Sequence, residues 1–232
     1  MTDAVDRLIV ALDVPSVEDA DALIAAIGDA ARFYKIGYQL TPVRGFALAR
    51  RLSDSGRNVF LDLKFHDIGA TVEKGVRSVR AVGADILTVH AERDVVAAAV
   101  AGRADDPRLK IFAVTVLTSL TQDALAAAGI DMPLAELVLK RAEIAAEAGA
   151  DGVIASAQEA AAIRARFGEA LQIVTPGVRP AGAAADDQAR IVTPAGAVAA
   201  GADRLVVGRP ITQAHDPAAA ARAIVAEIDA AR

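Results

Sequence analysis

Asp62, Lys64 and Asp67 are charged residues at the end of an otherwise apolar run, NVFLDLKFHDIGAT over residues 58–71. The run has the length and composition of a buried parallel strand. Side chains two residues apart point to the same face of a strand, so Asp62 and Lys64 share a face. Burying a charge without a partner is costly, and neighbouring carboxylates keep a partly buried lysine protonated. A lone Asp-x-Lys is typical of a structural salt bridge, whereas the full Asp-x-Lys-x-x-Asp at a strand end indicates a functional site.

A second set of polar residues follows the last two expected strands. Gly177 and Arg179 come after residues 173–175, and Gly208 and Arg209 come at the end of residues 205–208. Glycine lets backbone N–H groups approach an anion, and arginine offers a bidentate fork. Gln188 can add a neutral donor. In a barrel this corner usually binds phosphate, so we expect a phosphorylated small molecule as the ligand. Two surface arginines beside turn glycines are the alternative.

Short apolar runs alternate with longer alanine-rich amphipathic segments along the chain. Eight strand-then-helix units predict an α/β protein with a single (β/α)8 TIM barrel, one catalytic domain over residues 1–232. The expected strands cover residues 8–12, 33–37, 59–64, 86–90, 111–116, 152–155, 173–175 and 205–208. No Gly-x-Gly-x-x-Gly follows the first strand, which disfavours an open dinucleotide-binding sheet.

Capping residues mark where several helices begin. Ser16 and Asp19 form a capping box for a helix that ends at Ile27. Thr41 precedes Pro42, which predicts a helix with proline in its first position that runs to about residue 55. A further helix is expected over residues 71–82.

The active sites of such barrels lie at the C-terminal ends of the strands. Those ends carry polar residues in this chain, namely Asp13, Lys35, Asp62, Lys64, His90, Thr118, Arg179 and Arg209. Taken singly, Asp13 could be a helix-capping or loop residue. His90 taken singly could simply donate a hydrogen bond to a backbone carbonyl. Polar groups at so many strand ends rarely arise by accident, so together these residues predict one active site.

Composition excludes several other classes of function. The chain has no cysteine, and His66, His90 and His215 do not have the spacing of a helical metal site, so we expect no metal and no disulfide. A net charge of −5 and 3% aromatic residues argue against nucleic-acid binding. No apolar stretch is long enough to span a membrane, and the N-terminus carries acids where a signal peptide has basic residues. We expect a cytoplasmic protein that acts on a small molecule.

Several short motifs together resemble the orotidine 5′-phosphate decarboxylase family. They are LD at residues 12–13, KIG at 35–37, DLKFHDI at 62–68, VTVLTS at 114–119, PGVRP at 176–180, DQ at 187–188, TP at 193–194 and GRPIT at 208–212. Each motif alone is weak, but the set follows the order and spacing of the family from residue 8 to residue 212.

The resemblance implies cofactor-free decarboxylation of orotidine 5′-monophosphate to UMP, the last step of pyrimidine nucleotide synthesis. It implies a catalytic charge array of Lys35, Asp62, Lys64 and Asp67, in which Lys64 donates a proton to C6 of the pyrimidine. In a homodimer of this family, Asp67 and Thr71 come from the neighbouring subunit. The remaining implied substrate contacts are Asp13 and Lys35 to the ribose, Thr118 to the pyrimidine ring, and Gln188, Arg179 and the Gly208–Arg209 pair to the phosphate.

The chain departs from the common family pattern in two places. Gly69 and Ala70 stand where the family usually has Pro-Asn, and residues 92–94 read Glu-Arg-Asp where glycines are frequent. Neither change touches the four charged positions. We also expect residues 181–186 to form a lid over the phosphate.

Two competing functions remain open from the sequence. The first is a Mg²⁺-dependent barrel such as 3-keto-gulonate 6-phosphate decarboxylase or hexulose phosphate synthase, which shares the Asp-x-Lys-x-x-Asp motif. Those enzymes place a glutamate on the second strand as part of the metal site, whereas this chain has Lys35, which would repel a metal. The second is a non-catalytic phosphate-binding barrel, which has no need of Lys64 between two acids.

Overall fold

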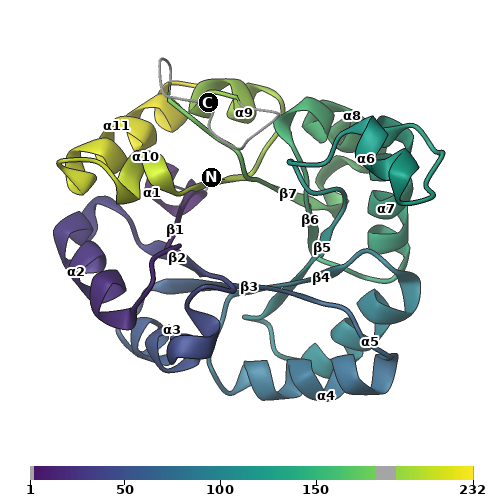
Figure 1. The fold of residues 1–232 in the computed structure, drawn as a ribbon, viewed down its shortest axis with the longest axis horizontal. Helices are drawn as coiled ribbons and strands as arrows, with labels where there is room; N and C mark the ends of the chain where they lie inside the picture. The colour runs from purple at the N-terminus through teal and green to yellow at the C-terminus, as the bar shows by residue number, and fades with distance from the viewer. Residues whose placement is uncertain (1–2, 181–191, 232) are drawn as a thin grey trace.

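The computed structural model describes residues 3–180 and 192–231. Its centre is a closed barrel of eight parallel strands that follow one another in chain order (Figure 1). The strands are β1 (Leu8–Ala11), β2 (Phe33–Ile36), β3 (Asn58–Phe65), β4 (Ile86–His90), β5 (Lys110–Val114), β6 (Gly152–Ile154), β7 (Gln172–Thr175) and β8 (Arg204–Val207). Pairing of β1 with β8 closes the ring. The predicted (β/α)8 barrel is therefore confirmed.

Most helices form a ring outside the barrel (Figure 1). They are α1 (Ala4–Arg7), α2 (Val17–Ile27), α3 (Gly45–Asp54), α4 (Gly69–Arg80), α5 (Arg93–Arg103), α6 (Gln122–Ala127), α7 (Leu134–Glu147), α8 (Ala157–Phe167), α9 (Pro194–Ala199), α10 (Arg209–Thr212) and α11 (Pro217–Ala230). Short 3₁₀ turns cover Gly28–Ala30, Thr41–Val43 and Gly168–Ala170. In the part of the chain that the structure describes, no helix is both long and apolar enough to cross a membrane.

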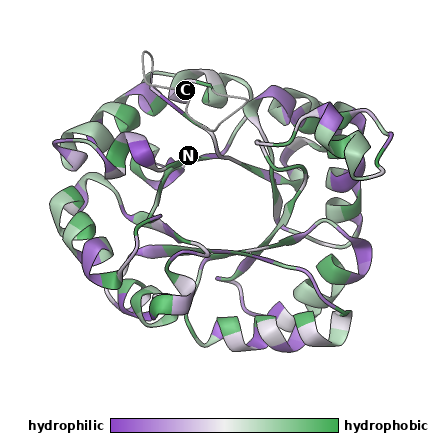
Figure 2. Ribbon diagram, viewed as in Figure 1, coloured by the Kyte–Doolittle hydropathy of each residue, from purple (hydrophilic) through white to green (hydrophobic). Residues whose placement is uncertain are grey.

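Strand alternation produces two apolar cores. One face of the strands fills the barrel with Ile9, Ala11, Phe33, Phe60, Ile86, Phe112, Val174 and Val206. The opposite face packs against the helices, which carry both hydrophobic and hydrophilic residues in Figure 2. Large rings such as Phe60 and Phe112 are almost fully buried inside the barrel. The polar residues at the C-terminal ends of the strands therefore lie above a closely packed apolar core.

The element boundaries match the sequence predictions closely, with two exceptions. The predicted helix from Thr41 is wrong at its start, because Thr41–Val43 is a 3₁₀ turn and α3 begins only at Gly45. Arg44 lies between them with φ of 74°, and the Thr41 hydroxyl donates to the Gly37 carbonyl instead of capping a helix. Helix α4 begins at Gly69, two residues earlier than predicted, after Ile68 in an extended conformation.

Candidate active site

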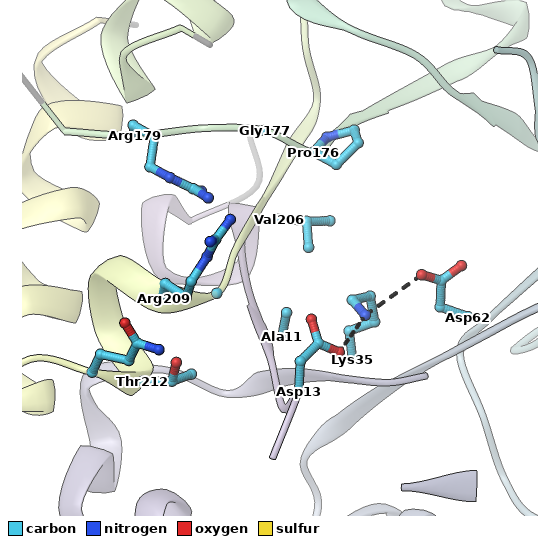
Figure 3. Close-up of a pocket in the computed structure, with 12 residues that line it drawn as sticks. Ala11, Asp13, Lys35, Asp62, Pro176, Gly177, Arg179, Val206, Arg209 and Thr212 are labelled. Atoms are coloured by element: carbon cyan, nitrogen blue, oxygen red, sulfur yellow. Dashed lines mark hydrogen bonds and ion pairs between the residues drawn. The ribbon is translucent and has the colours of Figure 1, made fainter. Parts of the chain in front are cut away.

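Two adjoining cavities lie at the C-terminal ends of the strands. The first has a volume of about 420 Å³ and is lined by Ala11, Asp13, Lys35, Asp62, Pro176, Gly177, Arg179, Val206, Gly208, Arg209, Thr212 and Gln213 (Figure 3). The second has a volume of about 230 Å³, and its lining adds Phe60, Lys64, Val114, Val116, Leu117, Thr118, Ser119, Ile154 and Ala155. Lys35, Asp62, Pro176 and Val206 line both cavities, so the charged pair stands where they meet.

Four charged side chains alternate in sign across this junction. The Lys35 Nζ lies 3.1 Å from an oxygen of Asp13 and 3.5 Å from an oxygen of Asp62 (Figure 3). The other oxygen of Asp62 lies 2.7 Å from the Lys64 Nζ. Gly37 leaves room for this arrangement, since a Cβ there would lie 3.2 Å from the Lys35 Nζ. The alternation offsets the cost of burying the charges of Lys35 and Asp62.

Asp62 is the centre of the array and stays ionised. Burial by itself raises the pKa of its carboxyl, but the charges of Lys35 and Lys64 and the hydrogen bonds from Lys64 and Thr88 act in the opposite direction. Together they hold the pKa below its ordinary value. The carboxylate is therefore a negative partner for both Lys35 and Lys64.

Strand β3 brings Lys64 to the cavity by an irregular path. Its pairing with β4 shifts between Leu61 and Phe65, and Lys64 has φ of 47°. This left-handed conformation is uncommon for a residue with a side chain and costs on the order of 1–3 kcal/mol. The predicted pairing of Lys64 with Asp62 is present, in a stretch where β3 departs from regular strand geometry. The Lys64 Nζ also lies 5.3 Å from the centre of the Tyr38 ring.

The expected phosphate corner is formed by the segments that follow β7 and β8. Arg179 and Arg209 point toward one another across the first cavity in Figure 3. Gly177, with φ of 75°, turns the chain between Pro176 and the arginine. Two converging guanidinium groups form a site for an anion with several oxygens.

The structure gathers most of the predicted site residues but not all. Those that line the cavities are Asp13, Lys35, Asp62, Lys64, Thr118, Arg179, Gly208 and Arg209. Asp67 and Thr71 are exposed at the start of α4, and the Asp67 carboxylate accepts a hydrogen bond from the Ile68 N–H. Among the described residues, Asp67 makes no ion pair with either lysine of the array. Gln188 and the predicted lid at 181–186 lie outside the described residues.

His90 lies beside the site rather than in it. Its ring centroid is 4.6 Å from that of His66, and the His66 Nε2 is 2.8 Å from a Glu92 oxygen. Partial burial and the neighbouring His66 lower the pKa of His90, so it is neutral near pH 7. Glu92 belongs to the segment that departs from the family pattern.

The sequence reasoning missed several residues of the site. Thr88 bonds to both Asp62 and Lys64, and Thr212 and Gln213 line the first cavity. Thr88 was detectable, because it lies two residues before His90 on a strand and hence on the same face. In the ranges 3–180 and 192–231, no group of three or more histidine, aspartate or glutamate side chains is arranged to hold a metal ion.

The fold and the site define a class of protein. It is a (β/α)8 barrel in which alternating lysine and aspartate side chains line the same cavity as two arginines suited to bind an anion. Sequence comparison then gives the family. The chain belongs to the orotidine 5′-phosphate decarboxylase / HUMPS family, whose model matches residues 6–224.

Individual relatives cover nearly the whole chain. Orotidine 5′-phosphate decarboxylase of Methylorubrum extorquens (strain PA1) is 59% identical over 224 residues, which are 97% of this chain and 96% of that protein. The protein of the same name from Rhodopseudomonas palustris (strain BisA53) is 55% identical over 226 residues, again 97% and 96%. The crystal structure of orotidine 5′-phosphate decarboxylase from Lactobacillus acidophilus superposes with a TM-score of 0.86 at 36% identity, covering 97% of this chain and 99% of that one.

Proposed function

We propose that this protein decarboxylates orotidine 5′-monophosphate to UMP in pyrimidine nucleotide synthesis, without a metal or an organic cofactor. The observation that carries the proposal is the position of Asp62, whose two oxygens lie 2.7 Å and 3.5 Å from the Lys64 and Lys35 ammonium groups where the two cavities meet. We further propose that the enzyme is a single catalytic domain over residues 1–232 and works in the cytoplasm, where pyrimidine nucleotides are made.

The substrate spans both cavities in this proposal. The phosphate binds Arg179 and Arg209, which flank the first cavity, with Gln188 and the Gly208 backbone as further donors. Asp13 and Lys35 hold the ribose hydroxyls between the two cavities. The pyrimidine ring lies in the second cavity beside Thr118, where Val116 and Ile154 supply apolar contact.

Lys64 carries the chemistry. The bond between C6 and the carboxylate carbon breaks, CO₂ leaves, and the electron pair stays on C6. The Lys64 ammonium stabilises that developing negative charge, transfers a proton to C6 and is reprotonated from water. The Asp62 carboxylate lies 2.7 Å from the Lys64 ammonium and stabilises its positive charge before transfer. Binding energy from the remote phosphate contributes to reaching the transition state.

A homodimer completes each site in the proposal, with Asp67 and Thr71 of one subunit reaching the array of the other. Two features support it. Asp67 and Thr71 are exposed, and among the described residues Asp67 makes no ion pair with Lys35 or Lys64. Ile68, next to Asp67 in the chain, is 74% exposed, and Tyr38, whose ring lies 5.3 Å from the Lys64 Nζ, is 62% exposed. Exposed apolar side chains of this size gain from burial against a second copy.

The first experiment is the ultraviolet decay of orotidine 5′-monophosphate on addition of purified protein in the presence of EDTA. We expect conversion to UMP at a rate that EDTA does not change. Folded protein that leaves the substrate unchanged would contradict the proposal.

The alternative function is that of a Mg²⁺-dependent sugar-phosphate lyase or decarboxylase of the same barrel family, such as 3-keto-gulonate 6-phosphate decarboxylase or hexulose phosphate synthase. The position of Lys35 disfavours it, because its ammonium lies between the carboxylates of Asp13 and Asp62 and would repel a divalent cation. Turnover of 3-keto-gulonate 6-phosphate with magnesium, and none of orotidine 5′-monophosphate, would favour this alternative.

The shared active site has its own test. Lys64→Ala and Asp67→Ala subunits are each expected to be inactive as homodimers. Mixing them should restore one complete site in each mixed dimer. Absence of recovery, with subunit exchange shown by mass spectrometry of tagged chains, would contradict the contribution of Asp67 across the interface.

A further inference from the structure

The Lys64 backbone needs a hydrogen-bond partner from outside the regular strand ladder. Between Leu61 and Phe65 the partners on β4 advance only from Leu87 to Val89. Four steps along β3 therefore face two steps along β4, and Lys64 lies inside this bulge with φ of 47°. A residue in this conformation persists only where its surroundings hold it.

Thr88 supplies that partner. The Lys64 backbone N–H donates to the Thr88 Oγ1 at 3.0 Å. The same Oγ1 lies 3.0 Å from the Asp62 Oδ1, and that oxygen also accepts a hydrogen bond from the Lys64 Nζ. A threonine hydroxyl has a single hydrogen, and a carboxylate oxygen can only accept, so the hydroxyl hydrogen points to Asp62. One side chain thus holds the backbone of Lys64 and the carboxylate that its ammonium contacts.

Thr88 is itself held rigidly. Its side chain is fully buried, and β4 keeps an unbroken register with β5 from Ile86 to His90. The hydroxyl therefore has a fixed position relative to the barrel. Its hydrogen bond from the Lys64 N–H fixes the irregular part of β3 against β4. A rigid second layer of this kind sets the geometry of the reacting groups.

We propose that Thr88 is a positioning residue that places the Lys64 ammonium for proton transfer to the substrate. The inference rests on the proposed role of Lys64 in decarboxylation. Thr88 lies outside the lining of both cavities, so it acts through Lys64 and Asp62 and not through substrate contact. Its removal should therefore change kcat and leave the binding of the phosphate end of the substrate intact.

Thr88→Val, compared with Thr88→Ser, tests the proposal. Valine keeps the shape and the strand preference of threonine and removes only the hydroxyl, whereas serine keeps the hydroxyl. We expect Thr88→Val to lower kcat by about 10- to 100-fold, the size of effect that a misplaced reacting group produces. KM should stay within about twofold of the wild type, because ground-state binding is unchanged. Thr88→Ser should stay close to the wild type in both constants.

The pH profile separates positioning from a merely structural role. Loss of the Thr88 hydrogen bond raises the pKa of Asp62 toward its ordinary value, so the acid limb of kcat should move to higher pH in Thr88→Val but not in Thr88→Ser. If Thr88→Val does not fold, the pair Thr88→Ala and Thr88→Ser asks the same question, since the two differ only in the hydroxyl.

Equal kcat in the valine and serine variants, or a wild-type kcat in Thr88→Val, would overturn the proposal while the wild type still converts orotidine 5′-monophosphate. A wild type without that activity would instead count against the proposed function. The two failures are therefore distinguishable in the same set of assays.

Discussion

The two mouths of the barrel hold their charged residues in different ways. At the C-terminal mouth, the charged groups of Lys35, Asp62 and Lys64 contact mainly one another and line open cavities. At the N-terminal mouth, charged side chains surround a smaller cavity of about 190 Å³ and are tied to the backbone as well. The same types of charged residue are therefore arranged differently at the two mouths of the barrel.

Three aspartates at the N-terminal mouth repeat a single arrangement. Asp85, Asp151 and Asp203 end the three Gly-Ala-Asp triplets at residues 83–85, 149–151 and 201–203, directly before β4, β6 and β8. Their carboxylates accept the backbone N–H of Val59, Ile111 and Ile173 at 2.7, 2.9 and 2.7 Å. Each also pairs with an arginine, respectively Arg108, Arg103 and Arg164.

The comparison separates stability from chemistry. A carboxylate that accepts a backbone N–H from the adjacent strand and also pairs with an arginine stabilises the pairing of neighbouring strands. A carboxylate that lines a cavity together with its lysine partners can act electrostatically on a ligand bound in that cavity. Barrels of this fold generally use their N-terminal face for stability and their C-terminal face for catalysis.

The largest expected effect comes from the C-terminal mouth. Lys64→Ala should lower kcat by at least about 10³-fold, because it removes the proposed proton donor. The free energy of unfolding should fall by about 1–2 kcal/mol, because the half-buried Asp62 loses one cation but keeps Lys35 and Thr88 as partners. Steady-state turnover and urea unfolding of the same preparation measure both. Lost phosphate binding together with lost turnover would point to a binding barrel rather than an enzyme.

The N-terminal mouth should respond in the opposite sense. Asp151→Asn should lower the free energy of unfolding by about 2–3 kcal/mol, because its half-buried partners Arg103 and Lys110 lose their anion. We expect kcat/KM to remain near that of the wild type. Asp105→Asn is the matched control, because the Asp105 side chain is 98% exposed and its ion pair with Arg80 is long, at 3.7 Å. A tenfold loss of activity in folded Asp151→Asn would break the comparison.

The smallest effect concerns acid stability. The pKa of Asp62 is lower in the folded protein than the ordinary value of about 3.9, so its ionised form stabilises the fold above that pH. This contribution should be lost as pH falls from about 4 through the lower folded value. Asp62→Asn should therefore show a shallower loss of stability than the wild type between pH 6 and pH 3, measured by urea unfolding. Parallel pH curves for the two proteins would contradict this account.

Local patterns sufficed for the barrel and for most of its active site. Short apolar runs and capping residues such as Ser16, which accepts the Asp19 N–H at 3.0 Å, depend on neighbours close in the chain. The polar residues at strand ends, from Asp13 to Arg209, could be collected because every parallel strand of a barrel ends at the same mouth. Their proposed roles came from the family resemblance and not from spacing.

Two other features escaped the sequence reasoning, and only the second depends on residues far apart in the chain. The left-handed Arg44 delayed helix α3, since Gly45 bonds back to the Leu40 carbonyl at 2.8 Å. The repeated Gly-Ala-Asp triplets are visible in the sequence, but their meaning comes from strand N–H groups 26 to 40 residues away.

By itself the sequence determined the order of strands and helices, the charged residues of the array and the family, because hydrophobic periodicity and short motifs are local properties. Only the tertiary structure decided how Lys64 reaches Asp62. The bulge in β3, the φ of 47° at Lys64 and the hydroxyl of Thr88 on β4 act together, and the Thr88 contacts span 24 and 26 residues of chain. Hydrogen bonds between strands form only when the barrel brings those strands together, so no local pattern specifies them.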